Sequence, residues 1–320
     1  MDNDDFYIGS TDEIYDSLEN MNLEFSNEVV CDFIIDVVEK NTQNDELKAL
    51  LNRVFVGFIE NTESESAQAF PPINEDYLIT LTEKMFSSLM DIGDILAAKL
   101  LFDFEYISAD ERDFVDSLIN LCKRKINDTN VQKEIDDLFR KNNKNDLVPT
   151  FDRLSNEIFE ISLGFVIGHE IGHHYYSHKG ASVNIETMAM DKGRRIMNYV
   201  DDLNDEHWKE LAADRFAFAF VHEFLTGFYH GKIKLHQLLG LFVAIMYICT
   251  RMNPFSYTNR HPAPLIRLIG IRCLVIDSYR SILNDWGTIS DYVDWLFTNI
   301  EIKDCNNNDK WWHYTVNTIC

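Results

Sequence analysis

Apolar residues recur three and four positions apart along most of the chain, a spacing that places them on one face of an α-helix. Val30, Phe33 and Val37 are typical of this pattern. Two segments, 54–59 and 182–187, are also compatible with short strands. We therefore predict a succession of amphipathic helices, over roughly residues 27–39, 46–59, 76–101, 131–140, 151–177, 206–225, 235–251, 263–282 and 290–300, with one more beginning after residue 108.

Polar segments separate these helices and suggest a division of the chain. Residues 61–75 hold a Thr-Glu-Ser-Glu-Ser run and then two consecutive prolines, which predicts a loop or an extended connection. The clearest polar break is Lys-Asn-Asn-Lys-Asn-Asp at 141–146. We therefore expect a helical N-terminal region over 1–147, of unknown function, and a core that carries the chemistry over 148–320.

The composition supports a helical globular protein. Hydrophobic residues make up 46% of the 320 residues, which excludes a disordered chain, and 13 glycines and 6 prolines are few for an all-β protein with many tight turns. The expected fold class is mainly α, with α+β as the alternative and at most a small β-sheet. The net charge of −24 would repel phosphate backbones, so nucleic acid is not an expected partner.

The cysteines and the apolar runs indicate the compartment. The six cysteines, at positions 31, 122, 249, 273, 305 and 320, form no CxxC pair, which is typical of reduced, buried thiols rather than a disulfide framework. The acidic N-terminus has no secretory signal pattern. The longest apolar run, 238–249, is shorter than the roughly 20 residues that a membrane span requires. We expect a cytoplasmic protein without a membrane span; its oligomeric state is open.

Candidate metal chemistry lies within the long apolar helix. His169-Glu170-Ile171-Gly172-His173 places two histidines four residues apart, so that both side chains point to one side, one turn apart, as a single tetrahedral metal requires. Glu170 is turned about 100° from them and is suited to deprotonate a metal-bound water. The alternative is a buried helix whose histidines are simply hydrogen-bonded. Gly168 and Gly172 predict that another backbone passes close by.

A third metal ligand is offered by the helix predicted at 206–225. Glu210 and Asp214 are four residues apart among aromatic residues, so one carboxylate can bind a metal while the other accepts the second ring N–H of a ligand histidine. The alternative is a solvent-exposed acidic pair. A metzincin site would require a third histidine at position 179, where a lysine stands.

One further segment, Arg260 to Leu268, combines a histidine, a proline-started helix and an arginine in an apolar run. Arg267 requires an acidic partner if it is buried, and His261 is suited to the edge of a cleft. The alternative interpretation is a loop followed by an ordinary core helix.

These three motifs together resemble the gluzincin metallopeptidases of the CAAX-prenyl-endopeptidase and HtpX type: HExxH at 169–173, ExxAD at 210–214 and HPxxxxR at 261–267. The resemblance implies a zincin-like helical core. It also implies a role for each motif residue: His169, His173 and Glu210 bind Zn²⁺, Glu170 is the general base, Asp214 supports a ligand histidine, His261 stabilises the oxyanion and Arg267 pairs with Asp214.

That group usually carries transmembrane helices, which this sequence lacks. In being soluble the chain is more similar to the Lit-type phage-exclusion peptidases and the ImmA-type peptidases. The function expected is zinc-dependent endopeptidase activity on a specific cytosolic protein, in phage exclusion or a stress response. The alternative is a helical regulatory protein with a structural zinc site, in which His174 or a cysteine supplies a fourth ligand.

Overall fold

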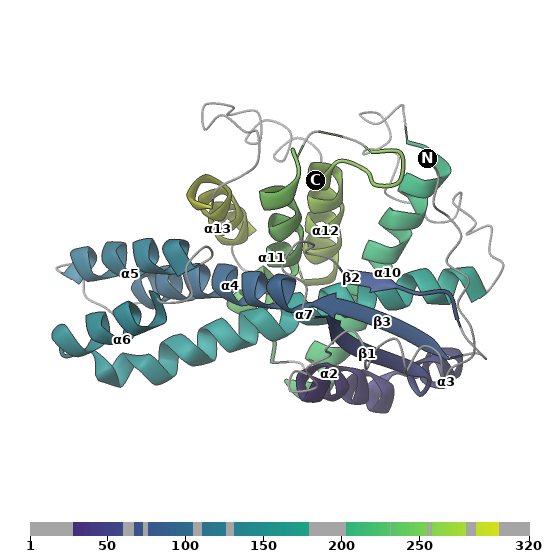
Figure 1. The fold of residues 1–320 in the computed structure, drawn as a ribbon, viewed down its shortest axis with the longest axis horizontal. Helices are drawn as coiled ribbons and strands as arrows, with labels where there is room; N and C mark the ends of the chain where they lie inside the picture. Colours follow the sequence, from purple (N-terminus) through teal and green to yellow (C-terminus); the bar gives the residue numbers. More distant parts are fainter. Residues whose placement is uncertain are drawn as a thin grey trace.

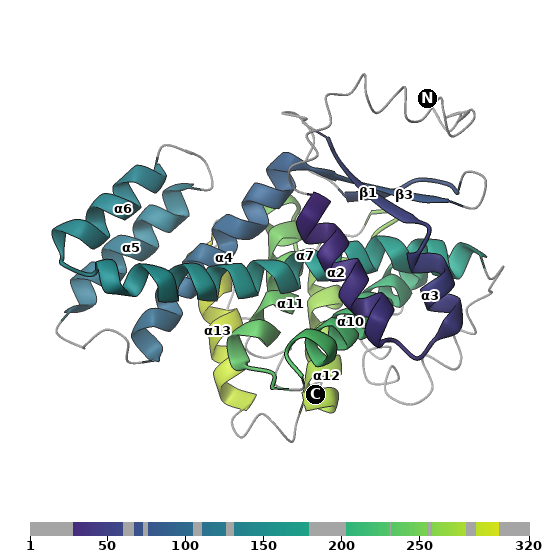
Figure 2. The ribbon, with the colours of Figure 1, turned by 90° about the horizontal axis from the view of Figure 1, so that it is seen from below.

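The computed structural model describes residues 28–59, 67–72, 76–104, 111–125, 131–178, 203–230, 232–254, 256, 258–279 and 286–300. This part of the chain is mainly helical and has one small three-stranded sheet (Figures 1 and 2), which confirms the expected fold class. The elements in chain order are α2 (Glu28–Asn41), α3 (Asp45–Leu51), β1 (Val54–Ile59), β2 (Ala67–Ala69), β3 (Tyr77–Thr82), α4 (Glu83–Asp103), α5 (Arg112–Lys125), α6 (Val131–Lys141), the 3₁₀ turn η3 (Asn145–Leu147), α7 (Val148–His178), α10 (Asp205–Phe228), α11 (Leu235–Arg251), α12 (Pro264–Tyr279) and α13 (Trp286–Asn299).

Helix α7 forms the centre of the molecule. It packs against α4, α10 and α11, and Figure 1 shows α5 and α6 near the end where it begins and the sheet along its later half. Because α7 is surrounded by other elements, its apolar residues are buried on several sides; Phe165, Ile167 and Ile171 are examples. The 148–320 boundary coincides with the start of α7 and stays a prediction.

Glycines allow the neighbouring helices to approach α7 closely. A Cβ at Gly168 would lie 3.0 Å from the Cα of Ala217, and one at Gly172 would lie 3.1 Å from the Cα of Ala213. Both contacts are with the backbone of α10, which confirms the prediction that another backbone passes at these positions. At Gly240 of α11, a Cβ would lie only 2.6 Å from the carbonyl oxygen of Ile158. Helices α10 and α11 therefore both approach the backbone of α7 closely, α11 near Ile158 and α10 near Gly168 and Gly172.

The sheet differs from part of the sequence prediction. Its order is β1-β3-β2, with β1 parallel and β2 antiparallel to β3. Residues 77–82 were expected to begin a helix but form strand β3, whose buried run Tyr-Leu-Ile-Thr-Leu-Thr pairs on both sides. A short apolar run buried on both faces has no helical or strand period of its own, so tertiary pairing determines its structure.

Segment 46–59 was expected to be helical, with strand as an alternative for its second half. Helix α3 ends at Leu51 and strand β1 begins at Val54, so the strand alternative is confirmed for 54–59. Residues 67–69, expected within a loop, form the edge strand β2. The second possible strand, 182–187, lies outside the described residues.

The cysteine prediction needs one correction. Cys31, Cys122 and Cys249 are buried thiols, as expected, but Cys273 is disulfide-bonded. Spacing along the sequence indicates CxxC pairs only, whereas a disulfide joins cysteines that the fold brings together. No described helix is long and apolar enough to cross a membrane, and the longest apolar run, 238–249, is buried within α11.

Candidate active site

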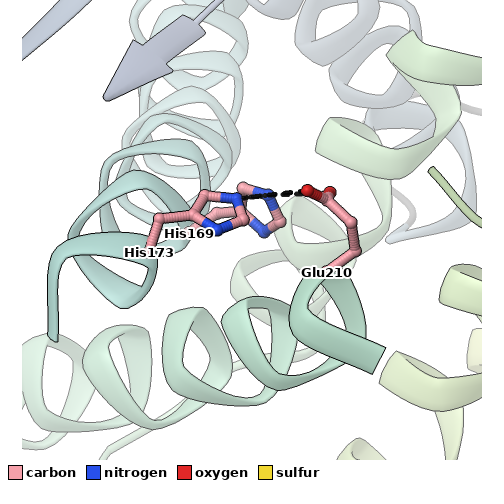
Figure 3. Close-up of side chains that lie close together, drawn as sticks. All are labelled: His169, His173 and Glu210. Carbon is pink, nitrogen blue, oxygen red and sulfur yellow. Dashed lines mark hydrogen bonds and ion pairs between the residues drawn. The ribbon is translucent and has the colours of Figure 1, made fainter. Parts of the chain in front are cut away.

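The residues predicted to bind a metal lie where α7 and α10 pack together. His169 and His173 are one turn apart on α7, and Glu210 faces them from α10 (Figure 3). The two Nε2 atoms are 3.1 Å apart. The two carboxylate oxygens of Glu210 each lie 3.3 Å from one of these Nε2 atoms. In the described part of the chain, these three residues form a group that could hold a metal ion.

A buried ion pair supports the site from behind. The guanidinium of Arg267, on α12, donates to both oxygens of Asp214, on α10, over 2.8 and 2.6 Å. Nδ1 of His169 lies 2.9 Å from the same carboxylate. Since Asp214 is acceptor-only when ionised, His169 donates Nδ1–H to it, and the lone pair of Nε2 is directed toward His173 and Glu210.

The pKa values of these groups reflect a site that attracts a cation. Burial alone would raise the pKa of Glu210, but the adjacent rings of His169, His173 and His261 hold it well below its ordinary value. Burial likewise opposes ionisation of Asp214, and the Arg267 charge and the His169 hydrogen bond lower its pKa. Burial and the Arg267 charge disfavour protonation of His169, yet the two carboxylates outweigh them and raise its pKa to about 9.

His261 approaches the site from the loop before α12. Its Nδ1 lies 3.1 Å from Oε2 of Glu210, and half of its side chain is exposed. Pro262, Ala263 and Pro264 are buried and anchor the end of the loop against the core. His261 thus stands at the exposed edge of a group in which His169 and Glu210 are buried and His173 is half-buried.

Glu170 is held by the sheet. The backbone amide of Ala69 donates to Oε2 of Glu170 over 2.8 Å. The next amide, of Phe70, donates to Leu78 across the strand pair, so Ala69 faces the unpaired edge of β2. The carboxylate of Glu170, which is itself buried, therefore lies between α7 and the edge strand.

The structure brings together the site residues that the sequence motifs suggested, from three separate segments: His169, Glu170, His173, Glu210, Asp214, His261 and Arg267. His174 is turned away from them: it is buried, its ring packs on Tyr77 of β3, and burial lowers its pKa to about 4. Sequence reasoning missed the amide of Ala69, because a backbone donor has no residue signature.

Sequence reasoning also missed the capping pair Asn204 and His207, whose side chains donate hydrogen bonds to the loop that carries His261. An N-cap residue followed three positions later by Glu or Gln would have been a recognisable signal, but histidine occupies that position.

A pair of histidines facing a buried carboxylate, with a further carboxylate held at the unpaired edge of a sheet, is an arrangement typical of hydrolases that use a metal. The comparison with protein families gave one match: residues 108–275 match the family described as Peptidase U49. That match covers more than half of the chain, and the chain belongs to this peptidase family. All the site residues named above except Ala69 fall within it. Comparison with curated proteins and with solved structures gave no match.

Proposed function

We propose that this peptidase is a zinc-dependent endopeptidase whose metal is bound by His169, His173 and Glu210. The observation that carries the proposal is the spacing of the three donor atoms, 3.1 Å between the histidine nitrogens and 3.3 Å from each to the carboxylate. Ligands at 2.0–2.1 Å from a tetrahedral zinc lie about 3.3 Å apart. The donor set, two imidazoles and one carboxylate, is also that of catalytic zinc sites.

Zinc bound there would polarise a peptide carbonyl and lower the pKa of a bound water to about 7. Glu170 accepts the proton of the attacking water and delivers it to the leaving amine. Asp214 fixes the tautomer and ring orientation of His169, and Arg267 keeps Asp214 ionised. His261 donates a hydrogen bond to the developing oxyanion, a contribution of about 3 kcal/mol in comparable enzymes.

The substrate of a peptidase is a protein, and we propose a specific cytoplasmic one. A charge of −24 favours a neutral or basic segment over an acidic one at the site. The cellular setting that the sequence resemblance implies is phage exclusion or a stress response.

The alternative, a regulatory protein with a structural zinc, requires a closed shell of four protein ligands. Within the described residues, the metal group has three members. His174, which could have been the fourth, contacts Tyr77 instead, and the buried thiols of cysteines 31, 122 and 249 are not part of the group. A three-ligand group leaves one coordination position for water or substrate, which favours the peptidase.

The proposal is tested by Glu170→Gln, which removes the base and leaves the three metal ligands in place. We expect this variant to retain one zinc per chain, measured by metal analysis, and to lose cleavage, measured as new N-terminal peptides after incubation with a cell lysate. Glu160→Gln, the same change on α7 beside Tyr229, is the matched control. We expect it to retain both zinc binding and cleavage. A His169→Ala, His173→Ala variant loses both.

Cleavage by Glu170→Gln at the wild-type rate would refute the assigned base. Wild-type protein that binds no zinc, or that generates no new N-termini, would refute the proposed function. The same Glu170→Gln protein, used as bait, retains the substrate if the site binds it before cleavage, and mass spectrometry then identifies it against the double-alanine control.

A further inference from the structure

We infer that His207 is a positioning residue that holds the loop of His261 in place and thereby sets His261 against Glu210. The inference rests on the proposed function, because it assigns His207 an effect on the rate through His261. It concerns a buried histidine that lies outside the three motifs and is not a member of the metal group.

The first step is the link from α10 to the loop. His207 lies in the first turn of α10 and its Nε2 is 2.7 Å from the carbonyl oxygen of Thr258, to which it donates. Its Nδ1 accepts the backbone amide of Asn204 at 3.4 Å. The side chain of Asn204 donates to the next carbonyl of the loop, that of Asn259, over 3.0 Å. Two consecutive loop carbonyls are thus bound by the cap of α10.

The second step is the link from Thr258 to His261. The amide of Thr258 donates to the carbonyl of His261 over 3.0 Å, and the amide of His261 donates to Oγ1 of Thr258 over 2.8 Å. These reciprocal bonds close a tight turn. Because both ends of the turn are paired, a displacement of Thr258 carries His261 with it.

The third step is that packing of the turn itself does not fix it, although the buried residues 262 to 264 anchor the segment that follows. Residues 258 to 261 are all exposed, so packing does not hold them. On the far side, His261 contacts Glu210, which lies one helical turn after His207 on α10. The loop is therefore bound twice to the same stretch of α10, once by His207 and once at the metal group. The positions of His261 and Glu210 are therefore both fixed relative to α10.

A matched pair of substitutions separates this role from capping. Gln and Glu at position 207 both form a capping box with Asn204, but only Gln can donate to the carbonyl of Thr258. We expect His207→Gln to cleave at close to the wild-type rate. For His207→Glu we expect a rate about 10- to 100-fold lower, the range that displacement of a catalytic group by about 1 Å produces. The measured rate is the initial appearance of the most abundant new N-terminal peptide in the lysate.

A double-mutant cycle tests whether the effect passes through His261. If it does, His207→Glu has little further effect in a His261→Ala background, because there is no histidine left to misplace. His236→Ala is the control for loss of a buried hydrogen-bonded histidine: His236 pairs with Glu157 at the start of α11, away from the site, and its loss leaves the rate unchanged. Equal fold-losses for His207→Glu in both backgrounds would overturn the inference.

A second measurement needs neither metal nor substrate. Trypsin cleaves after Arg260, which is exposed within the turn, and the rate in metal-free protein reports how firmly the loop is held. We expect faster cleavage in His207→Glu and near wild-type cleavage in His207→Gln. An unchanged trypsin rate in His207→Glu would overturn the positioning role. If the wild type shows no peptidase activity while this rate changes as expected, the proposed function fails and the placement of the loop stands.

Discussion

The buried ion pair behind the metal group allows a quantitative test of how the site is built. Arg267 and Asp214 come from different helices, are both buried, and make two hydrogen bonds of 2.8 and 2.6 Å. In Arg267→Met the apolar part of the side chain is kept, but Asp214 loses the Arg267 charge and both hydrogen bonds from it, and keeps the bond from His169. The burial of this carboxylate is then compensated by one neighbour instead of two.

The expected loss follows from that burial. Removing one partner of a buried ion pair costs about 3–5 kcal/mol, because the remaining charge stays desolvated. An exposed pair of the same two residue types contributes about 0–1 kcal/mol. Arg140 and Asp137 form such a pair on α6, with the Arg140 side chain 69% exposed. We therefore expect Arg267→Met to lower the free energy of unfolding by about 3 kcal/mol or more, and Arg140→Met to leave it nearly unchanged.

The assay is urea unfolding followed by far-UV circular dichroism, in EDTA so that metal binding does not contribute to stability. The double variant Arg267→Met, Asp214→Asn is expected to be less destabilised than the sum of its single variants by at least about 1 kcal/mol, since the residues share one interaction. If Arg267→Met costs no more than Arg140→Met, the argument from burial is wrong.

Two further predictions concern packing and pH. Gly240→Ala places a Cβ 2.6 Å from the Ile158 carbonyl and should destabilise the fold by about 1–3 kcal/mol. At Gly270 a Cβ would meet nothing within 4 Å, so Gly270→Ala should stabilise the fold by about 0.5–1 kcal/mol. Equal effects of the two substitutions in thermal unfolding would contradict this prediction. Burial, opposed by Lys125, raises the pKa of Asp91 from 3.8 to about 6, so its contribution to stability is full below pH 3.8 and falls by about 3 kcal/mol as pH rises through 6. Asp91→Asn should lack this fall in urea unfolding between pH 3.5 and 7, and an identical pH dependence in both proteins would contradict it.

The helices that carry the chemistry were predictable because their signals are local. The period of apolar residues indicates α7 and α11, and the spacing of His169 and His173 requires only that α7 be helical. The glycines at 168 and 172 even predicted a close neighbour, since glycine in a helix interior is costly without one. They did not reveal that this neighbour is α10.

The parts that sequence reasoning missed depend on contacts between distant segments. Strand β3 has a buried apolar run that suits a helix equally well until β1 and β2 pair with it. The Ala69 amide reaches Glu170 only because the free edge of β2 lies against α7. Neither of these contacts produces a periodic pattern in the sequence.

The sequence alone determines the helical character of the chain, its acidity and the residues suited to metal chemistry. Periodicity, charge and motif spacing are properties of neighbouring positions, so they can be read without the fold. The fold determines which of these residues come into contact. The 3.3 Å distances from Glu210 to His169 and His173, the Asp214–Arg267 pair and the placement of His261 by His207 arise where α7, α10 and α12 pack. Those distances are set by side-chain packing and burial across segments far apart in the chain, which no local pattern encodes.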